Sequence, residues 1–401
     1  MKIYGKTIPE IFQMLPWPYK AVVVLGTAFF LFAVPYSLHF FLTLGVVTEK
    51  VEPIAFPGLG GNVRGMLDPA VASDGKQAIM AHTTTTAVDF GSGPQFSAEV
   101  NLERASAPCR AWMTISGVGL RARDDDQVPD PIDPRKSLPR GIWRAETPAI
   151  VYDPDDPGRQ WKLYGYRYFW NGDEQTARIY GAIVQATAPK PEGPWTDENW
   201  LFTARPDLPP EPYSGFPRYH LSTLSPELAD VIFYARPSVV YFRKTLFMTL
   251  SAFVMGSRTP DRVILLSSTD HGNSWAYRGT VLRGADAPKM GSYEHVTGAS
   301  LLLYENKLYL AAVLGNKTAD GLGTFLIPFA NEITAQLARD EKTGAPVIAN
   351  HFPRNSLQPS ALGGGFAAYT DLCRTGMMIG EYSDIRQSFQ IFKTYKKPLD
   401  K

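Results

Sequence analysis

Five segments of the chain repeat one outline, and this repetition restricts the fold more than any other feature of the sequence. In each segment a small residue or a proline leads into an apolar strand, and a second, aromatic-rich strand follows after a turn. Such a strand pair cannot bury both faces alone, so repeated units stack on one another. The repeats begin at Asp68, Thr147, Arg236, Gly298 and Gln358. We therefore predict an all-β fold, a single five-bladed β-propeller over residues 62–397.

The composition excludes several classes of protein. The chain has 44% hydrophobic residues and a net charge of +1, from 40 Lys and Arg against 39 Asp and Glu. Binding to nucleic acid needs a concentrated basic surface, so we expect no nucleic-acid partner. The six histidines are scattered without paired ligand spacing, and no glycine-rich phosphate loop is present. We expect no cofactor and no metal centre.

A long uncharged run, residues 21–47, precedes the repeats. It exceeds the roughly 20 residues that cross a bilayer, and no small-residue cleavage site follows it. We expect one transmembrane α-helix at 21–47, after a cytoplasmic segment 1–20 and before a linker 48–61. Three lysines lie before the run against one glutamate, so the positive-inside rule places the N-terminus in the cytoplasm. The chain would then be a single-pass protein of the inner membrane, with its main domain periplasmic or extracellular.

The expected partners of this helix are the lipid bilayer and other membrane-protein subunits. Six aromatic residues within 21–47 suit packing against neighbouring helices. His39 lies in the same run, where an ionisable residue is a functional-site hypothesis. It either contacts a neighbouring backbone, helix or lipid headgroup, or binds a cofactor, and the sequence leaves these alternatives open.

Three local features concern turns and cross-links. The pattern of Ser268, Asp270, Gly272 and Trp275 is that of an Asp-box, a structural hairpin turn. Two acidic stretches, residues 124–126 and 153–158, are acidic enough for Ca²⁺, although we favour solvated turns for both. The two cysteines, Cys109 and Cys373, fall in the first and last repeats, which ring closure would make neighbours. A disulfide and two buried thiols both remain open.

The repeats resemble the blade signatures of five-bladed propeller glycosidases, glycoside hydrolase families 43 and 32. The resemblance covers about residues 66 to 393, and the Asp-box is of the sialidase type. It is carried by the following segments: DPAVASDG, ETPAIVYDPDDPGRQWKLYGYRY, APKPEGPWT, ARPSVVYFRKTLFMT and GASLLLYENKLYLAAV.

The resemblance implies a catalytic set that this chain keeps only in part. Asp68 fits the aspartate base at the start of the first blade. The family's tuning aspartate corresponds to Arg236, and its general-acid glutamate corresponds to Gly298. Hydrolysis of a glycoside needs two carboxyl groups, one to protonate the leaving oxygen and one to activate water. An arginine at 236 would also keep nearby carboxyl groups ionised. The set is therefore degenerate, and we expect inefficient hydrolysis at best.

Two glutamates could replace the missing carboxyl groups if their loops bend toward the axis. These are Glu146 in the second repeat and Glu294 before the fourth. Arg144, Arg236 and His295 would complete a polar cluster that binds substrate. Each of these residues also has an ordinary alternative, as a surface-loop or ion-pair residue.

Two functions remain open from the sequence. The first is a non-catalytic accessory subunit, docked through residues 21–47 on an integral-membrane complex, for example a respiratory or photosynthetic one. The altered positions 236 and 298 favour it. The alternative is a membrane-tethered glycoside hydrolase or glycan-binding protein that acts on extracellular polysaccharide. Carbohydrate is therefore a second expected partner, and any enzyme activity would be glycoside hydrolysis.

Overall fold

The computed structural model describes most of the chain after residue 50. The described residues are 2–3, 6–7 and 51–400, with gaps at 58–62, 90–93, 131–132, 134, 204–218, 318–320, 354–365, 375, 384–387 and 396. The chain divides into two units, Met1–Glu49 and Lys50–Lys401. In the first, β1 (Lys2–Ile3) pairs antiparallel with β2 (Lys6–Thr7). The predicted membrane segment 21–47, with His39, lies outside the described residues. No helix in the described part is long and apolar enough to cross a bilayer.

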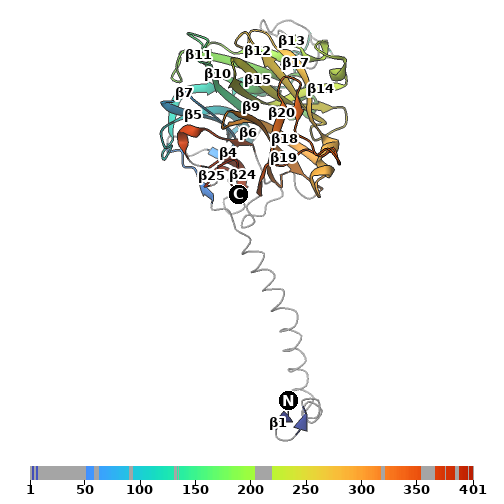
Figure 1. Ribbon diagram of the computed structural model, residues 1–401. Helices are drawn as coiled ribbons and strands as arrows, with labels where there is room; N and C mark the ends of the chain where they lie inside the picture. The colour runs from blue at the N-terminus through green and yellow to red at the C-terminus, as the bar shows by residue number, and fades with distance from the viewer. Residues whose placement is uncertain are drawn as a thin grey trace. The chain divides into compact units, whose positions relative to one another are not determined.

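The second unit is a five-bladed β-propeller, as the repeats predict (Figure 1). Blade I contains β4 (Val63–Ser73), β5 (Gln77–Asp89), β6 (Pro94–Ser106) and β7 (Met113–Leu120). Blade II contains β8 (Arg123–Asp125), β9 (Gly141–Tyr152), β10 (Trp161–Trp170), β11 (Ala182–Ala188), β12 (Asn199–Thr203) and β13 (Tyr219–His220). The short helix α4 (Glu174–Ile179) follows β10.

The remaining blades follow in chain order. Blade III contains β14 (Val231–Phe242), β15 (Thr245–Val254), β16 (Arg262–Ser268) and β17 (Ala276–Arg283). Blade IV contains β18 (His295–Tyr304), β19 (Lys307–Gly315), β20 (Gly323–Asn331), β21 (Gln336–Leu337) and β22 (Asn350–Pro353). Blade V contains β23 (Ala367–Ala368), β24 (Met378–Ser383), β25 (Ser388–Thr394) and β3 (Val51–Pro53). Short 3₁₀ helices cover Leu221–Thr223, Pro226–Leu228, Gly284–Met290 and Asp371–Cys373.

The innermost strands of the blades surround a common axis. β4 contacts β9, β9 contacts β14, β14 contacts β18, β18 contacts β23, and β23 contacts β4 again, so the ring is closed. The four predicted repeat starts that the structure describes do not begin these strands. Asp68, Thr147, Arg236 and Gly298 lie inside them, because each strand extends upstream of the repeated motif. Gln358 lies outside the described residues.

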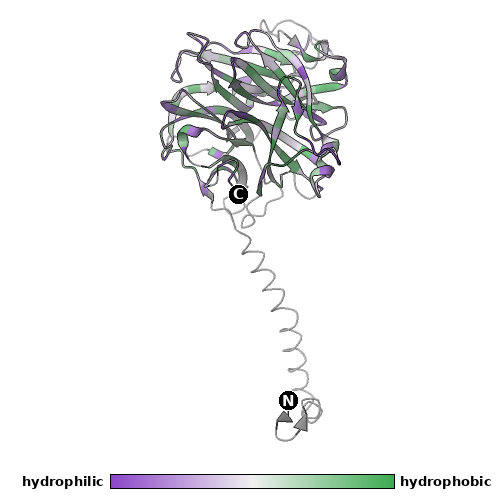
Figure 2. Ribbon diagram, viewed as in Figure 1, coloured by the Kyte–Doolittle hydropathy of each residue, from purple (hydrophilic) through white to green (hydrophobic). Residues whose placement is uncertain are grey.

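The hydrophobic core lies between the blades, and one cluster fills each of the five interfaces. Strands such as β10 and β16 are buried along nearly their whole length, because a blade on each side covers both of their faces. Figure 2 shows hydrophobic residues along the strands and hydrophilic residues in many of the turns. Stacking of blades therefore buries what one blade alone would expose.

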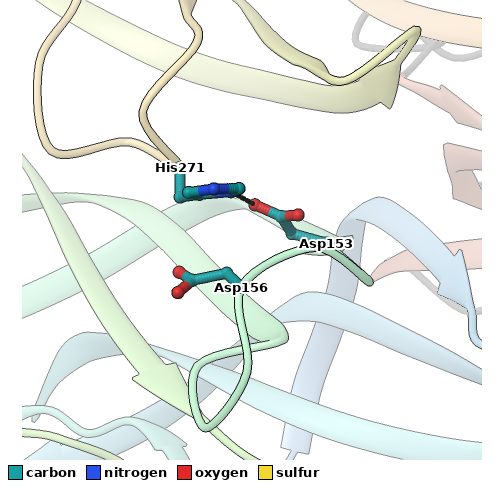
Figure 3. A group of neighbouring side chains, drawn as sticks. All are labelled: Asp153, Asp156 and His271. Atoms are coloured by element: carbon teal, nitrogen blue, oxygen red, sulfur yellow. Dashed lines mark hydrogen bonds and ion pairs between the residues drawn. The ribbon is translucent and has the colours of Figure 1, made fainter.

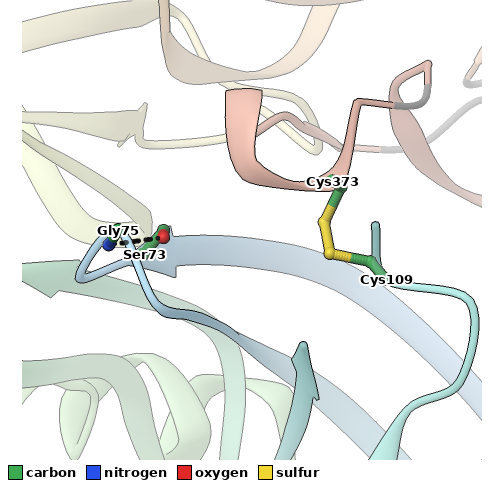
Figure 4. Close-up of a disulfide and its surroundings, with 4 residues drawn as sticks. All are labelled: Ser73, Gly75, Cys109 and Cys373. Atoms are coloured by element: carbon green, nitrogen blue, oxygen red, sulfur yellow. Dashed lines mark hydrogen bonds between the residues drawn. A yellow bond between two sulfur atoms is a disulfide. The ribbon is translucent and has the colours of Figure 1, made fainter. Parts of the chain in front are cut away.

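Blade V combines residues from both ends of the propeller. Its outer strand β3 pairs with β25, with Val51 opposite Thr394. From the sequence, residues 51–53 were expected to lie in the linker, because three residues are too few to show an alternating strand pattern. Blade V is also linked to blade I by the Cys109–Cys373 disulfide, with an S–S distance of 1.96 Å (Figure 4). The structure thus answers the question that the sequence left open.

The Asp-box forms the turn between β16 and β17. Asp270 accepts hydrogen bonds from the Ser268 hydroxyl and from the Ser274 backbone N–H, at 2.7 and 2.8 Å. Gly272 adopts φ +86°, in the left-handed region that glycine favours. Trp275 is buried in the core between blades II and III. The turn thus anchors the end of blade III.

Candidate functional site

Three β-bulges place side chains at the axis of the propeller. The pairing of the inner strand with its neighbour shifts at Asp68 in blade I, at Thr147 in blade II and at Arg236 in blade III. All three residues have left-handed backbone conformations, with φ of 54°, 50° and 58°, and each precedes a proline. Strained non-glycine residues of this kind concentrate at functional sites. The repeated motif thus marks the bulges that build a site.

An axial pocket of about 550 Å³ lies along these strands. The three bulge residues line it, together with residues of β18 and the segment 366–374 of blade V. This volume is within the range of about 300 to 1,000 Å³ that holds small ligands. The pocket therefore has the size and position of a binding site.

Asp68 is the buried carboxyl group of the pocket, with only 8% of its surface exposed. The Thr83 hydroxyl donates a hydrogen bond to it at 3.2 Å, and the same hydroxyl accepts one from the backbone N–H of Thr147 at 2.9 Å. A hydroxyl has one proton, so accepting from Thr147 directs that proton to Asp68. Thr83 thus connects blades I and II and orients the carboxyl group.

Burial raises the pKa of Asp68 from 3.8 to about 7. Arg236 lowers this pKa, the charge of Glu146 raises it, and the Thr83 hydrogen bond lowers it. Arg236 lowers the pKa of Asp68, as the sequence predicts, but desolvation has the larger effect, so the arginine alone does not keep this carboxyl group ionised. Asp68 can hold a proton at neutral pH.

Glu146 is the second carboxyl group of the cluster, and its side chain is partly buried. Tyr168 donates a hydrogen bond to its Oε1. Burial raises the pKa of Glu146, while the Tyr168 hydrogen bond and the charges of Arg144 and Arg236 lower it. Glu146 thus has more groups around it that favour the ionised form than Asp68 has. We call Asp68, Glu146, Arg144, Arg236 and Tyr168 the axial cluster.

The two arginines are fixed by aromatic rings. The Arg236 guanidinium carbon lies 5.2 Å from the ring centroid of Phe366, and that of Arg144 lies 4.8 Å from Trp170. Next to Arg236, Gly298 leaves space for the ring. A Cβ at position 298 would lie 2.6 Å from Cζ of Phe366 and 3.0 Å from an Nη atom of Arg236. Gly298 therefore accommodates the stacked Arg236–Phe366 pair.

The other two predicted residues are not part of this cluster. Glu294 is exposed, and its Oε1 lies 3.8 Å from Nζ of Lys317. It is not among the groups that shift the pKa values of Asp68 or Glu146. His295, the first residue of β18, is partly buried opposite Gly315. Of the two substitutes considered for the missing carboxyl groups, the structure brings only Glu146 near Asp68.

Aspartates in the two acidic stretches of the sequence form ion pairs with basic side chains of the protein. Asp153 and Asp156 lie with His271 of the Asp-box turn, and Asp153 contacts His271 Nδ1 at 3.0 Å (Figure 3). These atoms are near enough to hold a metal ion, but the buried ammonium of Lys162 pairs with Asp156 and lies 3.8 Å from Asp153. The group is therefore an ion network between blades II and III, and neither aspartate is in a solvated turn. In the stretch 124–126, Arg140 pairs with Asp124.

Thr83, Tyr168 and Phe366 were not identified from the sequence. Thr83 belongs to a run of four threonines, and only the structure shows which hydroxyl faces Asp68. Tyr168 lies in an aromatic strand where alternate residues are hard to distinguish. Phe366 follows three glycines and shows no periodic pattern.

Comparisons with known proteins agree with this fold. No protein-family model matches the chain, and no curated protein matches it. A solved structure of the GH130 family of mannoside phosphorylases superposes with a TM-score of 0.50 and 11% identity, over 88% of this chain and 95% of that one. The chain is a five-bladed β-propeller, and this fold is what it shares with that structure. The GH130 family contains glycoside hydrolases that target β-1,2 mannosidic linkages in Candida mannan.

Two further structures give weaker superpositions. A putative glycosidase from Bacteroides thetaiotaomicron has a TM-score of 0.48 at 13% identity, over 84% of this chain and 88% of that one. A family 43 glycoside hydrolase from a Bacteroides ovatus xyloglucan locus has a TM-score of 0.43 at 12% identity, over 86% and 54%. The likeness to the solved structures concerns the fold, and the chemistry of this chain is argued from its own axial cluster.

Proposed function

We propose that this propeller is a glycoside hydrolase whose carboxyl pair is Asp68 and Glu146. The observation that carries the proposal is a pair of interacting carboxyl groups near the axis: Asp68 of blade I, which lines the axial pocket, and Glu146 of blade II, whose charge raises the pKa of Asp68. Paired carboxyl groups are what glycoside hydrolysis requires. The glycoside hydrolase fold supports the choice of substrate class.

The surroundings of the two groups suggest their roles. Burial raises the pKa of both groups. The Tyr168 hydrogen bond and the charges of two arginines favour the ionised form of Glu146, and Asp68, with a pKa of about 7, can hold a proton at neutral pH. In this proposal Asp68 protonates the leaving oxygen and Glu146 acts as the base toward water. The family resemblance suggested the base role for Asp68, so the two assignments can be tested against each other.

Leaving-group dependence tests the roles. With a poor leaving group, Asp68→Asn should lose about 10² to 10⁴ in kcat/KM, because the leaving oxygen needs its proton. With an activated leaving group such as 2,4-dinitrophenol the loss should be small, while Glu146→Gln should be slow with both. Asp340→Asn, in an exposed turn, is the matched control.

Three outcomes would count against this assignment. Equal loss for both leaving groups in Asp68→Asn would contradict the acid role. Sugar binding without any turnover would favour a glycan-binding protein. No binding or release across a broad glycoside panel would overturn the carbohydrate proposal.

The membrane tether remains a prediction of the sequence, and we include it in the proposal. The disulfide supports it, because disulfides persist outside the cytoplasm. The uncharged run 21–47 would hold the propeller at the outer surface of the inner membrane. Protease protection in spheroplasts would test it, and cleavage only after lysis would contradict it. The fold comparisons favour a carbohydrate-active protein over an accessory subunit of a membrane complex.

A further inference from the structure

The pocket differs from the expected glycosidase pattern at two positions, and the structure shows that the two differences fit together. The family resemblance called for carboxylates where the chain has Arg236 and Gly298. A side chain at 298 would collide with Phe366 and press against the Arg236 guanidinium. With glycine there, the Phe366 ring lies against Arg236. A guanidinium group, held against an aromatic ring, therefore lies near the axis where the resemblance implied carboxylates.

The neighbouring residues reinforce this positive character. The charge of Arg144 lowers the pKa of Glu146, and so does the charge of Arg236. Its Nε is buried and lacks a hydrogen-bond partner among the described residues. Both guanidinium groups lower the pKa of Glu146, so both favour negative charge at this part of the axis.

We propose that the pocket binds an acidic sugar, with Arg236 recognising the sugar carboxylate. A guanidinium is planar and carries its N–H donors in a fork that matches a carboxylate in two parallel hydrogen bonds. Phe366 on one face holds that fork in a fixed orientation. This inference names the substrate class of the proposed hydrolase and therefore rests on the proposed function.

Binding of matched sugar pairs by calorimetry at pH 6 and low salt tests the proposal. The pairs are glucuronate with glucose, galacturonate with galactose and mannuronate with mannose. We expect at least one uronate to bind ten times or more tightly than its neutral partner. The corresponding uronamide, which keeps the shape without the charge, should bind like the neutral sugar. This comparison needs no variant, so it stands even if substitutions unfold the protein.

Variants of Arg236 then locate the effect. Arg236→Gln should abolish the preference for the uronate, and Arg236→Lys should keep part of it because the charge remains. Arg339→Gln serves only as a binding control, since Arg339 pairs with Asp286 outside the pocket.

Other results would overturn the inference. These are equal affinity for uronate and neutral sugar, a preference that survives Arg236→Gln, and acetate or phosphate bound as tightly as the uronate, which would indicate a site for free anions. Efficient cleavage of neutral glycosides without uronate preference would overturn the inference and leave the hydrolase proposal standing. A uronate that binds tightly but is never cleaved from its glycosides would support the inference and overturn the hydrolase proposal.

Discussion

The pKa of Asp68 predicts how the stability of the propeller depends on pH. In the unfolded chain this carboxyl group ionises near 3.8, and in the folded chain near 7. The folded state therefore holds the proton more tightly, and stability is lost as pH rises from about 4 to about 7. A difference of about three pKa units is worth about 4 kcal/mol above pH 7. The native protein tolerates an ionised, desolvated Asp68 at that cost.

Asp68→Asn removes the titrating group and keeps its shape. Asparagine tolerates the left-handed φ of 54°, and its carbonyl oxygen can still accept the Thr83 hydrogen bond. Relative to wild type, the variant should therefore gain up to about 4 kcal/mol of stability between pH 4 and pH 8.

Thermal unfolding of both proteins across this range measures the gain. The Tm of the variant should exceed that of the wild type by a margin that grows with pH and reaches several degrees at pH 8. Asp126→Asn, at an exposed position, controls for the loss of a surface charge. A Tm difference between Asp68→Asn and wild type that is the same at pH 4 and pH 8 would refute the reasoning, because Asp68 would then have an unperturbed pKa.

Contacts within the same domain support three further predictions. Thr83→Val should move the pKa of Asp68 upward, because it removes a hydrogen bond that favours the carboxylate, whereas Thr83→Ser should leave it unchanged; ¹³C NMR titration of the Asp68 carboxyl carbon measures both. Replacing Cys109 and Cys373 by serine should destabilise the ring by up to about 5 kcal/mol, and denaturant unfolding of the oxidised and reduced wild type provides the comparison. Lys162→Met should cost about 3 to 5 kcal/mol in thermal and denaturant stability at neutral pH, because two buried carboxylates lose their shared cation; an undiminished Tm would contradict the ion network.

The number of blades could be predicted from the sequence because the repeated motif has a structural cause. Asp68, Thr147 and Arg236 each precede a proline at a β-bulge, so the same backbone solution recurs in three blades. The bounds of the strands could not be predicted, because the inner strands continue upstream of the bulges through less patterned residues. β3 has only three residues, so its pairing with β25 depends on tertiary structure.

The sequence suggested some members of the axial cluster, missed others, and indicated little of the cluster's chemistry. Glu146 adjoins the bulge residue Thr147, and this adjacency already suggested a place near the axis. Glu294 looked equivalent in the sequence, but it lies one residue before β18 and reaches Lys317 at the surface. The sign of the pKa shift at Asp68 could not be read from the sequence, because charge neighbours are visible there and depth of burial is not.

The central claim is that Asp68 carries the catalytic proton, and the pH dependence of kcat/KM tests it most directly. Once a cleaved glycoside is identified, the rate should fall with rising pH along a limb near 7, where Asp68 loses its proton. In Thr83→Val this limb should move to higher pH, and in Thr83→Ser it should stay in place. A limb near 7 that does not move in Thr83→Val, or a rate that rises through pH 7, would contradict the account.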